Sequence, residues 1–111
     1  MKDDLILRKE EDFNAIYKKG KSSPGKYVVV LYRPNGTDLT RKAFVASKKV
    51  GNSVMRNRAR RLMREAVRLS QVSLPNGYDF LFIARNGITV SKCADVRRSI
   101  EAALKRTGLT G

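Results

Sequence analysis

Histidine is absent from the 111-residue sequence, and cysteine occurs only once. Without histidine the chain has no Ser-His or Cys-His nucleophile, no two-histidine acid/base pair and no imidazole ligand for a metal. The single thiol, Cys93, can form neither an internal disulfide nor a cysteine zinc site. It shares a helical spacing with Val96, Ile100 and Ala103, so we interpret Cys93 as a core residue.

Long hydrophobic runs are also missing. The sequence nowhere contains the roughly 18 consecutive apolar residues that span a membrane. The apolar stretch within residues 1–7 is too short for a signal peptide, and no small-residue cleavage site follows it. We therefore expect a cytoplasmic protein with no membrane partner. With 41% hydrophobic residues, we expect one domain over residues 1–111, which buries about two thirds of the surface of its unfolded chain.

Acidic residues are scarce in the middle of the chain. Residues 41–68 contain ten lysines and arginines but one acid, Glu65, whereas residues 1–40 contain eight cations and six acids. Residues 69–111 contain six cations and three acids. The middle segment therefore carries nine of the fourteen net positive charges. Charge gathered in this way favours a polyanionic partner.

Acidic residues gather near the N-terminus instead, at Asp3, Asp4, Glu10, Glu11 and Asp12. They precede or begin the first predicted helix, where negative charge is favoured by the helix dipole. We interpret them as helix-capping residues rather than Mg²⁺ ligands. No protein catalytic residue and no protein-bound metal are predicted, so we expect the chain alone to perform no chemistry.

The basic segment predicts a helix that begins after Ser53. At about 100° per residue, one arc of this helix is apolar and the opposite arc is cationic. The apolar arc holds Met55, Ala59, Leu62, Ala66 and Leu69, with Met63 at its margin. The opposite arc holds Asn57, Arg60, Arg61, Arg64 and Arg68.

Every cation in this helix, from Arg56 onward, is arginine. Cations three or four residues apart repel by a few tenths of a kcal/mol per pair, so we expect apolar packing to hold the helix. The planar guanidinium suits bidentate contact with phosphate and stacking on bases. A solvated surface would mix both signs of charge. We therefore expect a nucleic acid to bind here.

The N-terminal third predicts a short helix, a loop and a hairpin. The helix covers residues 10–19, Gly20 caps it, and residues 20–26 form the loop. The hairpin joins strands at 27–32 and 41–47, and the segment 38–41 is compatible with a further short strand.

The C-terminal part predicts a strand at 78–84, whose apolar run belongs in the middle of a sheet covered on both faces. Ser91 caps a last helix that continues to about Arg106. The fold class is thus α+β, an α/β sandwich in the order α-β-β-(β)-α-β-α, with one mixed sheet packed against helices.

The segment Lys48–Arg61 resembles the arginine-asparagine-arginine motif of the bacterial ribonuclease P protein family. Leu7-Arg8-Lys9, followed by Asp12-Phe13, Tyr17 and Gly20, matches the opening pattern of the same family. With Ile83-Ala84-Arg85 at the end of a strand and the last helix, the resemblance covers almost the whole chain. Tyr17 stands where the family more often has phenylalanine, which preserves the ring.

This resemblance implies a left-handed β-α-β crossover through the basic helix, where general rules favour the right-handed form. It implies a protein subunit that helps a catalytic RNA remove the 5′ leader from precursor tRNA. Mg²⁺ would be bound chiefly by the RNA, and one protein would bind each catalytic RNA. Residues facing ribonuclease P RNA would be Lys49, Asn52, Arg58 and Arg61, and residues nearer the leader would be Lys48, Arg56, Asn57, Arg60 and Arg64. Arg68 completes the predicted RNA-binding set.

Phe13 and Tyr17 admit two interpretations. Composition favours packed core residues, because aromatic rings on a short amphipathic helix are usually buried. The resemblance implies a cleft in which these rings and Leu31 contact the leader, where stacking tolerates any base.

Two other functions fit the charge. A ribosomal-type RNA-binding scaffold would need the same basic helix, but the aromatic pair before Gly20 together with the Asn52–Asn57 motif favours the ribonuclease P protein. A metal-dependent nuclease acting alone would need converging carboxylates, which the sequence does not show.

Overall fold

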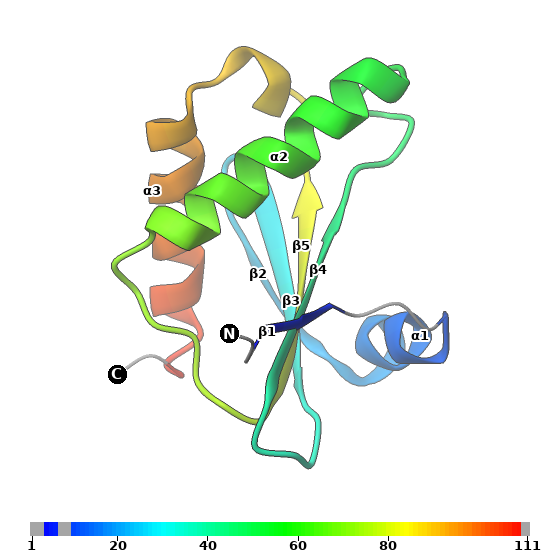
Figure 1. The fold of residues 1–111 in the computed structure, drawn as a ribbon, viewed down its shortest axis with the longest axis vertical. Coiled ribbons are helices and arrows are strands. Elements are labelled where there is room, and N and C mark those ends of the chain that lie inside the picture. The colour runs from blue at the N-terminus through cyan, green and yellow to red at the C-terminus, as the bar shows by residue number, and fades with distance from the viewer. Residues whose placement is uncertain (1–3, 7–9, 110–111) are drawn as a thin grey trace.

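The structure is a computed structural model that describes the backbone of residues 4–6 and 10–109 and the side chains of residues 14–109. Figure 1 shows a sheet with helices on both sides. In chain order the described elements are β1 (Asp4–Ile6), α1 (Glu10–Lys19), β2 (Lys21–Pro24), β3 (Val28–Pro34), β4 (Thr40–Val45), α2 (Ser53–Leu69), β5 (Tyr78–Ala84), the 3₁₀ helix η1 (Ile88–Val90) and α3 (Cys93–Arg106).

The described strands form one mixed sheet of five strands in the order β1-β4-β5-β3-β2. The central strand, β5, runs parallel to β4 and antiparallel to β3. The edge strands are β1, parallel to β4, and β2, antiparallel to β3. Phe80, Leu81 and Phe82 are all fully buried. The prediction of a central strand covered on both faces is therefore confirmed.

The predicted hairpin is wrong, because β5 lies between β3 and β4. The apolar run of β5 is favourable only in the middle of the sheet, where β3 and β4 pair with its two edges and both of its faces are covered. Parallel neighbours cannot be joined by a tight turn, so α2 crosses from β4 to β5. The left-handed sense of this crossover stays a prediction from the family resemblance.

The predicted loop at 20–26 is also wrong in part, because β2 is an edge strand. The Ser23 hydroxyl donates to the Ala103 carbonyl at 2.7 Å and ties β2 to α3. Pro24 is tolerated because an edge strand leaves one side without ladder bonds. The segment 38–41 forms no strand of its own, since Thr40 and Arg41 begin β4. The strand β1 was not predicted.

The last helix begins two residues later than its predicted cap. Lys92, not Ser91, occupies the N-cap position of α3, and its backbone nitrogen donates to the Asp95 carboxylate at 3.3 Å. The Ser91 hydroxyl instead donates to the Ile88 carbonyl at 2.6 Å and closes η1. A serine can bond backwards to a nearby carbonyl, and here that bond replaces the cap.

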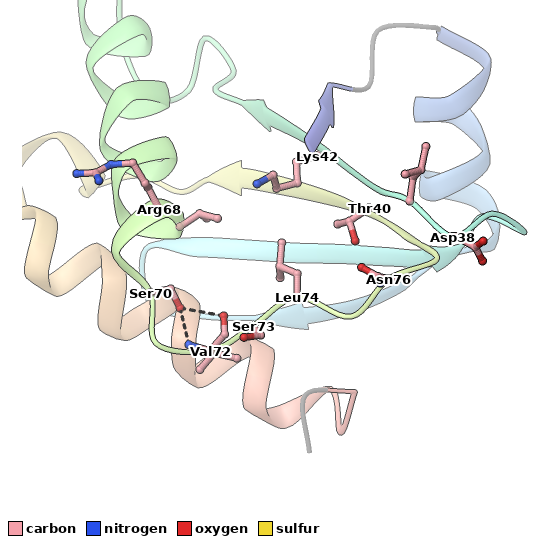
Figure 2. A pocket seen from close by; sticks show the side chains of 11 residues that line it. Asp38, Thr40, Lys42, Arg68, Ser70, Val72, Ser73, Leu74 and Asn76 are labelled. Atoms are coloured by element: carbon pink, nitrogen blue, oxygen red, sulfur yellow. Dashed lines mark hydrogen bonds between the residues drawn. The ribbon is translucent and has the colours of Figure 1, made fainter. Parts of the chain in front are cut away.

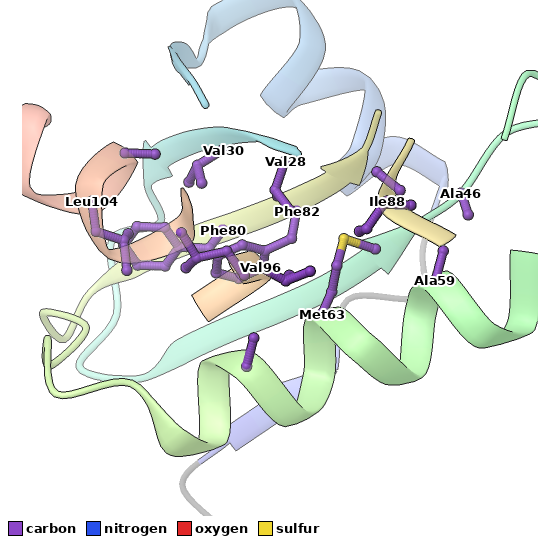
Figure 3. Close-up of a cluster of buried hydrophobic side chains, with 14 of the residues drawn as sticks. Val28, Val30, Ala46, Ala59, Met63, Phe80, Phe82, Ile88, Val96 and Leu104 are labelled. Atoms are coloured by element: carbon purple, nitrogen blue, oxygen red, sulfur yellow. The ribbon is translucent and has the colours of Figure 1, made fainter. Parts of the chain in front are cut away.

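Successive residues of β5 face opposite sides of the sheet. Phe80 and Phe82 enter the main core beneath α2 and α3 (Figure 3). Leu81 faces the other way and meets Ile16 of α1 and Ala43 of β4 in a smaller cluster. The sheet therefore carries α2 and α3 on one face and α1 on the other.

The inward face of α2 consists of Ala59, Met63 and Ala66, which are all fully buried. The predicted apolar arc is thus displaced, because Met63 lies at its centre rather than at its margin, and Met55 and Leu69 are exposed. Alanine on either side of one methionine lets α2 approach the sheet closely. We call Ala59, Met63 and Ala66 the buried strip of α2.

We predict that Met63→Ala lowers the free energy of unfolding by about 2–5 kcal/mol, because it leaves a cavity in the main core. Leu69→Ala is the matched control, since Leu69 is 44% exposed, and it should cost less than about 1 kcal/mol. Urea denaturation measures both. Equal losses for the two variants would contradict the displaced arc.

Candidate nucleic-acid interface

The beginning of α2 concentrates positive charge. Asn52 caps the helix, and its side-chain Oδ1 accepts a hydrogen bond from the Met55 backbone nitrogen at 3.0 Å. The first turn contains no acid, so nothing there opposes the positive end of the helix dipole. Lys48 and Lys49 are exposed just before the cap. The structure thus brings three predicted site residues to a helix terminus that favours anions.

The arginines of α2 form a ridge with a groove on each side. The outer groove is lined by Val54, Asn57, Arg60, Arg61 and Arg64. The α3 groove, between α2 and α3, is lined by Arg58, Arg61, Leu62, Glu65 and Cys93. Arg61 borders both grooves, so the two form one continuous cationic surface.

The one acid on α2 is already paired. The Arg68 Nε donates to Glu65 Oε1 at 3.0 Å, and its Nη2 donates to Oε2. The hydrogen bond from Arg68 lowers the pKa of the Glu65 carboxyl and raises the pKa of Arg68. Within the described residues, no acid pairs with Arg56, Arg58, Arg61 or Arg64, so their charge is available to a partner.

Arg64 is held over an aromatic ring. Its guanidinium carbon lies 5.4 Å from the centre of the Phe44 ring, and Phe44 stacks on Phe82 with ring centres 5.2 Å apart. Phe82 is fully buried and gives the stack a fixed base. Because a stacked guanidinium loses little further freedom when it binds, Phe44 orients Arg64 for a planar contact.

A further pocket lies at the C-terminal end of α2 (Figure 2). Lys42 from β4 and Arg68 from α2 line it together with the loop that follows the helix. The Ser70 hydroxyl accepts from the Val72 backbone nitrogen at 3.0 Å and shapes this loop. Asp38 also lines this pocket and Arg68 is paired with Glu65, so the pocket carries both signs of charge.

Tyr17 is not a core residue, because 54% of it is exposed. The core interpretation of Tyr17 is therefore wrong, and its neighbour Ile16 fills the core instead. Leu31 is partly buried and packs against the cluster of Ile16, Ala43 and Leu81. The side chain of Phe13 lies outside the described residues.

Cys93 is also less buried than predicted. It is partly exposed, and it packs at the edge of the main core while lining the α3 groove. Val96, Ile100 and Ala103, which share its helical spacing, are fully buried. The core prediction is therefore confirmed for Val96, Ile100 and Ala103, and only in part for Cys93.

Sequence reasoning missed a buried ion pair on the α1 side of the sheet, the side to which Leu81, two residues after Asp79, also points. Asp79 is fully buried, and Arg41 donates to both of its carboxylate oxygens, at 2.7 and 2.6 Å. Asn35 Nδ2 adds a third bond at 2.9 Å. Arg41 was counted among the cations of the basic segment, but Asp79 balances its charge. A lone acid inside the apolar run of β5 was the available signal.

No group of three or more His, Cys, Asp or Glu residues that could hold a metal occurs in the described part of the chain. Among the described carboxylates, those of Glu65, Asp79 and Asp95 are each bound to an arginine. Asp3 lies outside the described residues, as do the side chains of Asp4, Glu10, Glu11 and Asp12. Among the described helices, none has the length and apolar character needed to cross a membrane.

The fold and this surface define a class: a basic α/β protein that presents an arginine-rich helix to a nucleic acid. Comparison with known proteins narrows the class. The family model described as Ribonuclease P matches residues 1–108. The chain belongs to the ribonuclease P protein family, and the resemblance drawn from the arginine-asparagine-arginine motif is confirmed.

Individual relatives agree with this assignment. The ribonuclease P protein component of Pelotomaculum thermopropionicum is 42% identical over 101 residues, which cover 91% of this chain and 90% of that protein. A solved Staphylococcus aureus RNase P protein has a TM-score of 0.80 and 32% identity, covering 96% of this chain and 98% of that one. A solved S. aureus mutant with defective mRNA degradation activity has a TM-score of 0.83 and 31% identity, covering 95% and 89%. The predicted fold class is confirmed.

We predict that Phe44→Leu weakens RNA binding by about 0.5–2 kcal/mol, because Arg64 loses its aromatic support. Phe44→Tyr keeps the ring and should bind normally. Filter binding measures the RNA affinity of Phe44→Leu, of Arg64→Ala and of the double variant, which together form a double-mutant cycle. If Phe44→Leu weakens binding equally when Arg64 is already alanine, the ring does not act through Arg64.

Proposed function

We propose that the ridge of α2 binds the RNA of the ribonuclease and that the α1 side of the sheet contacts the leader. As a member of the ribonuclease P family, the chain is the protein subunit of the enzyme that matures the 5′ end of tRNA. The observation that carries the proposal is the unbalanced charge of α2, where six arginines accompany one acid that is already paired. Such a surface matches the phosphates of RNA.

The two grooves support a division of labour between α2 residues. Arg58 and Arg61 border the α3 groove, and with Lys49 and Asn52 they would face ribonuclease P RNA. The outer groove contains Asn57, Arg60 and Arg64, which with Lys48 and Arg56 would lie nearer the leader. This division follows the family resemblance, and opposite sides of one ridge are compatible with two RNA strands.

The leader would pass along the α1 side of the sheet. The exposed Tyr17 ring supports this role, because a base can stack on it without displacing core atoms. Leu31 and Phe13 would complete the contact. Stacking suits a leader whose sequence varies, since every base has a π face.

Chemistry in this proposal belongs to the RNA. The described residues contain no cluster of three or more possible metal ligands, and the chain has no histidine for acid/base work. The Mg²⁺ of the holoenzyme would therefore be bound chiefly by the RNA, with one protein for each catalytic RNA. The protein would act in the cytoplasm and would reduce phosphate repulsion between the two RNAs.

We predict that the RNA-free protein does not cleave precursor tRNA, and that it lowers the Mg²⁺ concentration that ribonuclease P RNA needs for cleavage. A Mg²⁺ titration of leader release, with and without protein, is the measurement. Because one solved relative is a mutant with defective mRNA degradation activity, an mRNA substrate should be included. Cleavage of precursor tRNA by RNA-free protein would overturn the assignment of chemistry to the RNA.

We predict a steep salt dependence. If the protein contacts about six to eight phosphates, a plot of the logarithm of its affinity for RNA against the logarithm of the salt concentration has a slope on the order of −4 to −7. Arg60→Ala and Arg61→Ala should each make this slope shallower by about one. Lys105→Ala, at the far end of α3, is the control that should leave it unchanged. Unchanged slopes for both arginine variants would place α2 away from RNA.

We predict that Tyr17→Ala scarcely changes the thermal melt, because the ring is largely exposed. Affinity of the holoenzyme for precursor tRNA should fall by about 1–3 kcal/mol, the value of one stacked base. Mature tRNA lacks the leader and serves as the control. Equal weakening of both tRNAs, with an unaltered melt, would reject leader contact at Tyr17. Phe13→Ala should be tested in parallel.

A further inference from the structure

Arg97 lies on the side of α3 that faces α2. It is four residues after Cys93, which lines the α3 groove, and four residues before Glu101. The Glu101 carboxylate accepts a hydrogen bond from the Gln71 backbone nitrogen at 2.8 Å, directly after α2 ends. Residues four apart share one helix face. Both neighbours of Arg97 on that face therefore meet α2 or the loop that follows it.

The Arg97 side chain has no partner within the described protein. Its Nε is buried and makes no hydrogen bond. The next residue, Arg98, is exposed and donates to Asp95 at 2.6 Å. A buried donor without an acceptor destabilises the free protein, and an apolar side chain at this position would avoid that cost. An acceptor from outside the chain would reach the terminal nitrogens of this guanidinium, which are not among the buried atoms, rather than Nε.

The charges around this position favour an anion. Arg58 and Arg61 on the α2 side have no acidic partner among the described residues. Of the two acids nearby, Glu65 is balanced by Arg68, whereas Glu101 keeps its charge and accepts from the Gln71 backbone nitrogen. Arg58 and Arg61 line this groove, and Arg97 follows its lining residue Cys93 by one helical turn. Phosphate accepts bidentate hydrogen bonds from arginine.

We propose that the α3 groove binds a backbone phosphate of ribonuclease P RNA and that Arg97 is one of its ligands. The inference rests on the proposed function of α2 and extends that surface to a second helix. Ribonuclease P RNA is the partner rather than the leader because the groove is lined by Arg58 and Arg61, the α2 arginines assigned to that RNA. The helices α2 and α3 also lie on the opposite side of the sheet from α1 (Figure 1). Arg97 acts in binding, not in chemistry.

The test uses Arg97→Met, which keeps the length and apolar stem of the side chain. Affinity for ribonuclease P RNA should fall about tenfold, as expected for the loss of one charge-assisted hydrogen bond. The slope of log affinity against log salt should become shallower by about one. The melting temperature of the RNA-free protein should stay the same or rise. Arg98→Met is the matched control and should bind within about twofold of the parent.

Arg61→Ala, on the part of α2 assigned to ribonuclease P RNA, is measured beside it to separate two failures. If Arg61→Ala weakens binding and Arg97→Met does not, Arg97 is not a phosphate ligand and the proposed function stands. If neither variant weakens binding, the proposed function of α2 fails as well. Weaker binding of precursor tRNA by the holoenzyme, with unchanged affinity for ribonuclease P RNA, would overturn the choice of partner.

A lower melting temperature with normal affinity would show that Arg97 is only structural. If Arg97→Met lowers both quantities, Arg97→Lys decides, because lysine restores the charge but not the guanidinium packing. Recovery of affinity and salt slope in Arg97→Lys, while the melt stays low, supports phosphate binding. No recovery overturns it.

Discussion

The structure depends on the apolar contacts that hold α2 against the sheet, because the arginines of this helix repel one another. Six arginines on α2 include about five pairs spaced three or four residues apart, and their mutual repulsion amounts to about 1–2.5 kcal/mol. Full burial of Met63 alone contributes about 1.5–3 kcal/mol. The buried strip therefore outweighs the repulsion, and Asn52 adds a cap at the crowded end. A helix held in this way can present charge outward without any acid to balance it.

The two faces of the sheet separate two tasks. Phe80 and Phe82 support α2 and α3, whereas Leu81 and Asp79 face the side of α1. The bidentate pair between Arg41 and Asp79 balances one cation internally, so the charge left for a partner lies mainly on α2 and beside it. A buried pair of this kind is weak evidence for added stability. Its effect here is to neutralise Arg41, so that this cation does not add to the charge that can bind RNA.

Periodicity and charge predicted much of the fold, namely α1, α2, α3 and the central strand β5. They failed where the pairing is set by tertiary contacts. The short strand β2 is recognisable only through its ladder with β3 and its bond from Ser23 to α3. The hairpin was wrong because β5, much later in the chain, takes the place between β3 and β4. The arginine ridge was visible as a motif, whereas the Phe44 support and the position of Arg97 require the packed helices.

The central claim is that the ridge of α2 contacts ribonuclease P RNA, and directed hydroxyl-radical cleavage tests it most directly. An iron chelate would be tethered to cysteine through Val54→Cys, beside the outer groove, or through Lys105→Cys at the end of α3. Both would carry Cys93→Ala, which removes the single native thiol. The account predicts strong, localised cuts in the RNA from position 54 and few from position 105. Strong cuts from position 105 and none from position 54 would contradict it.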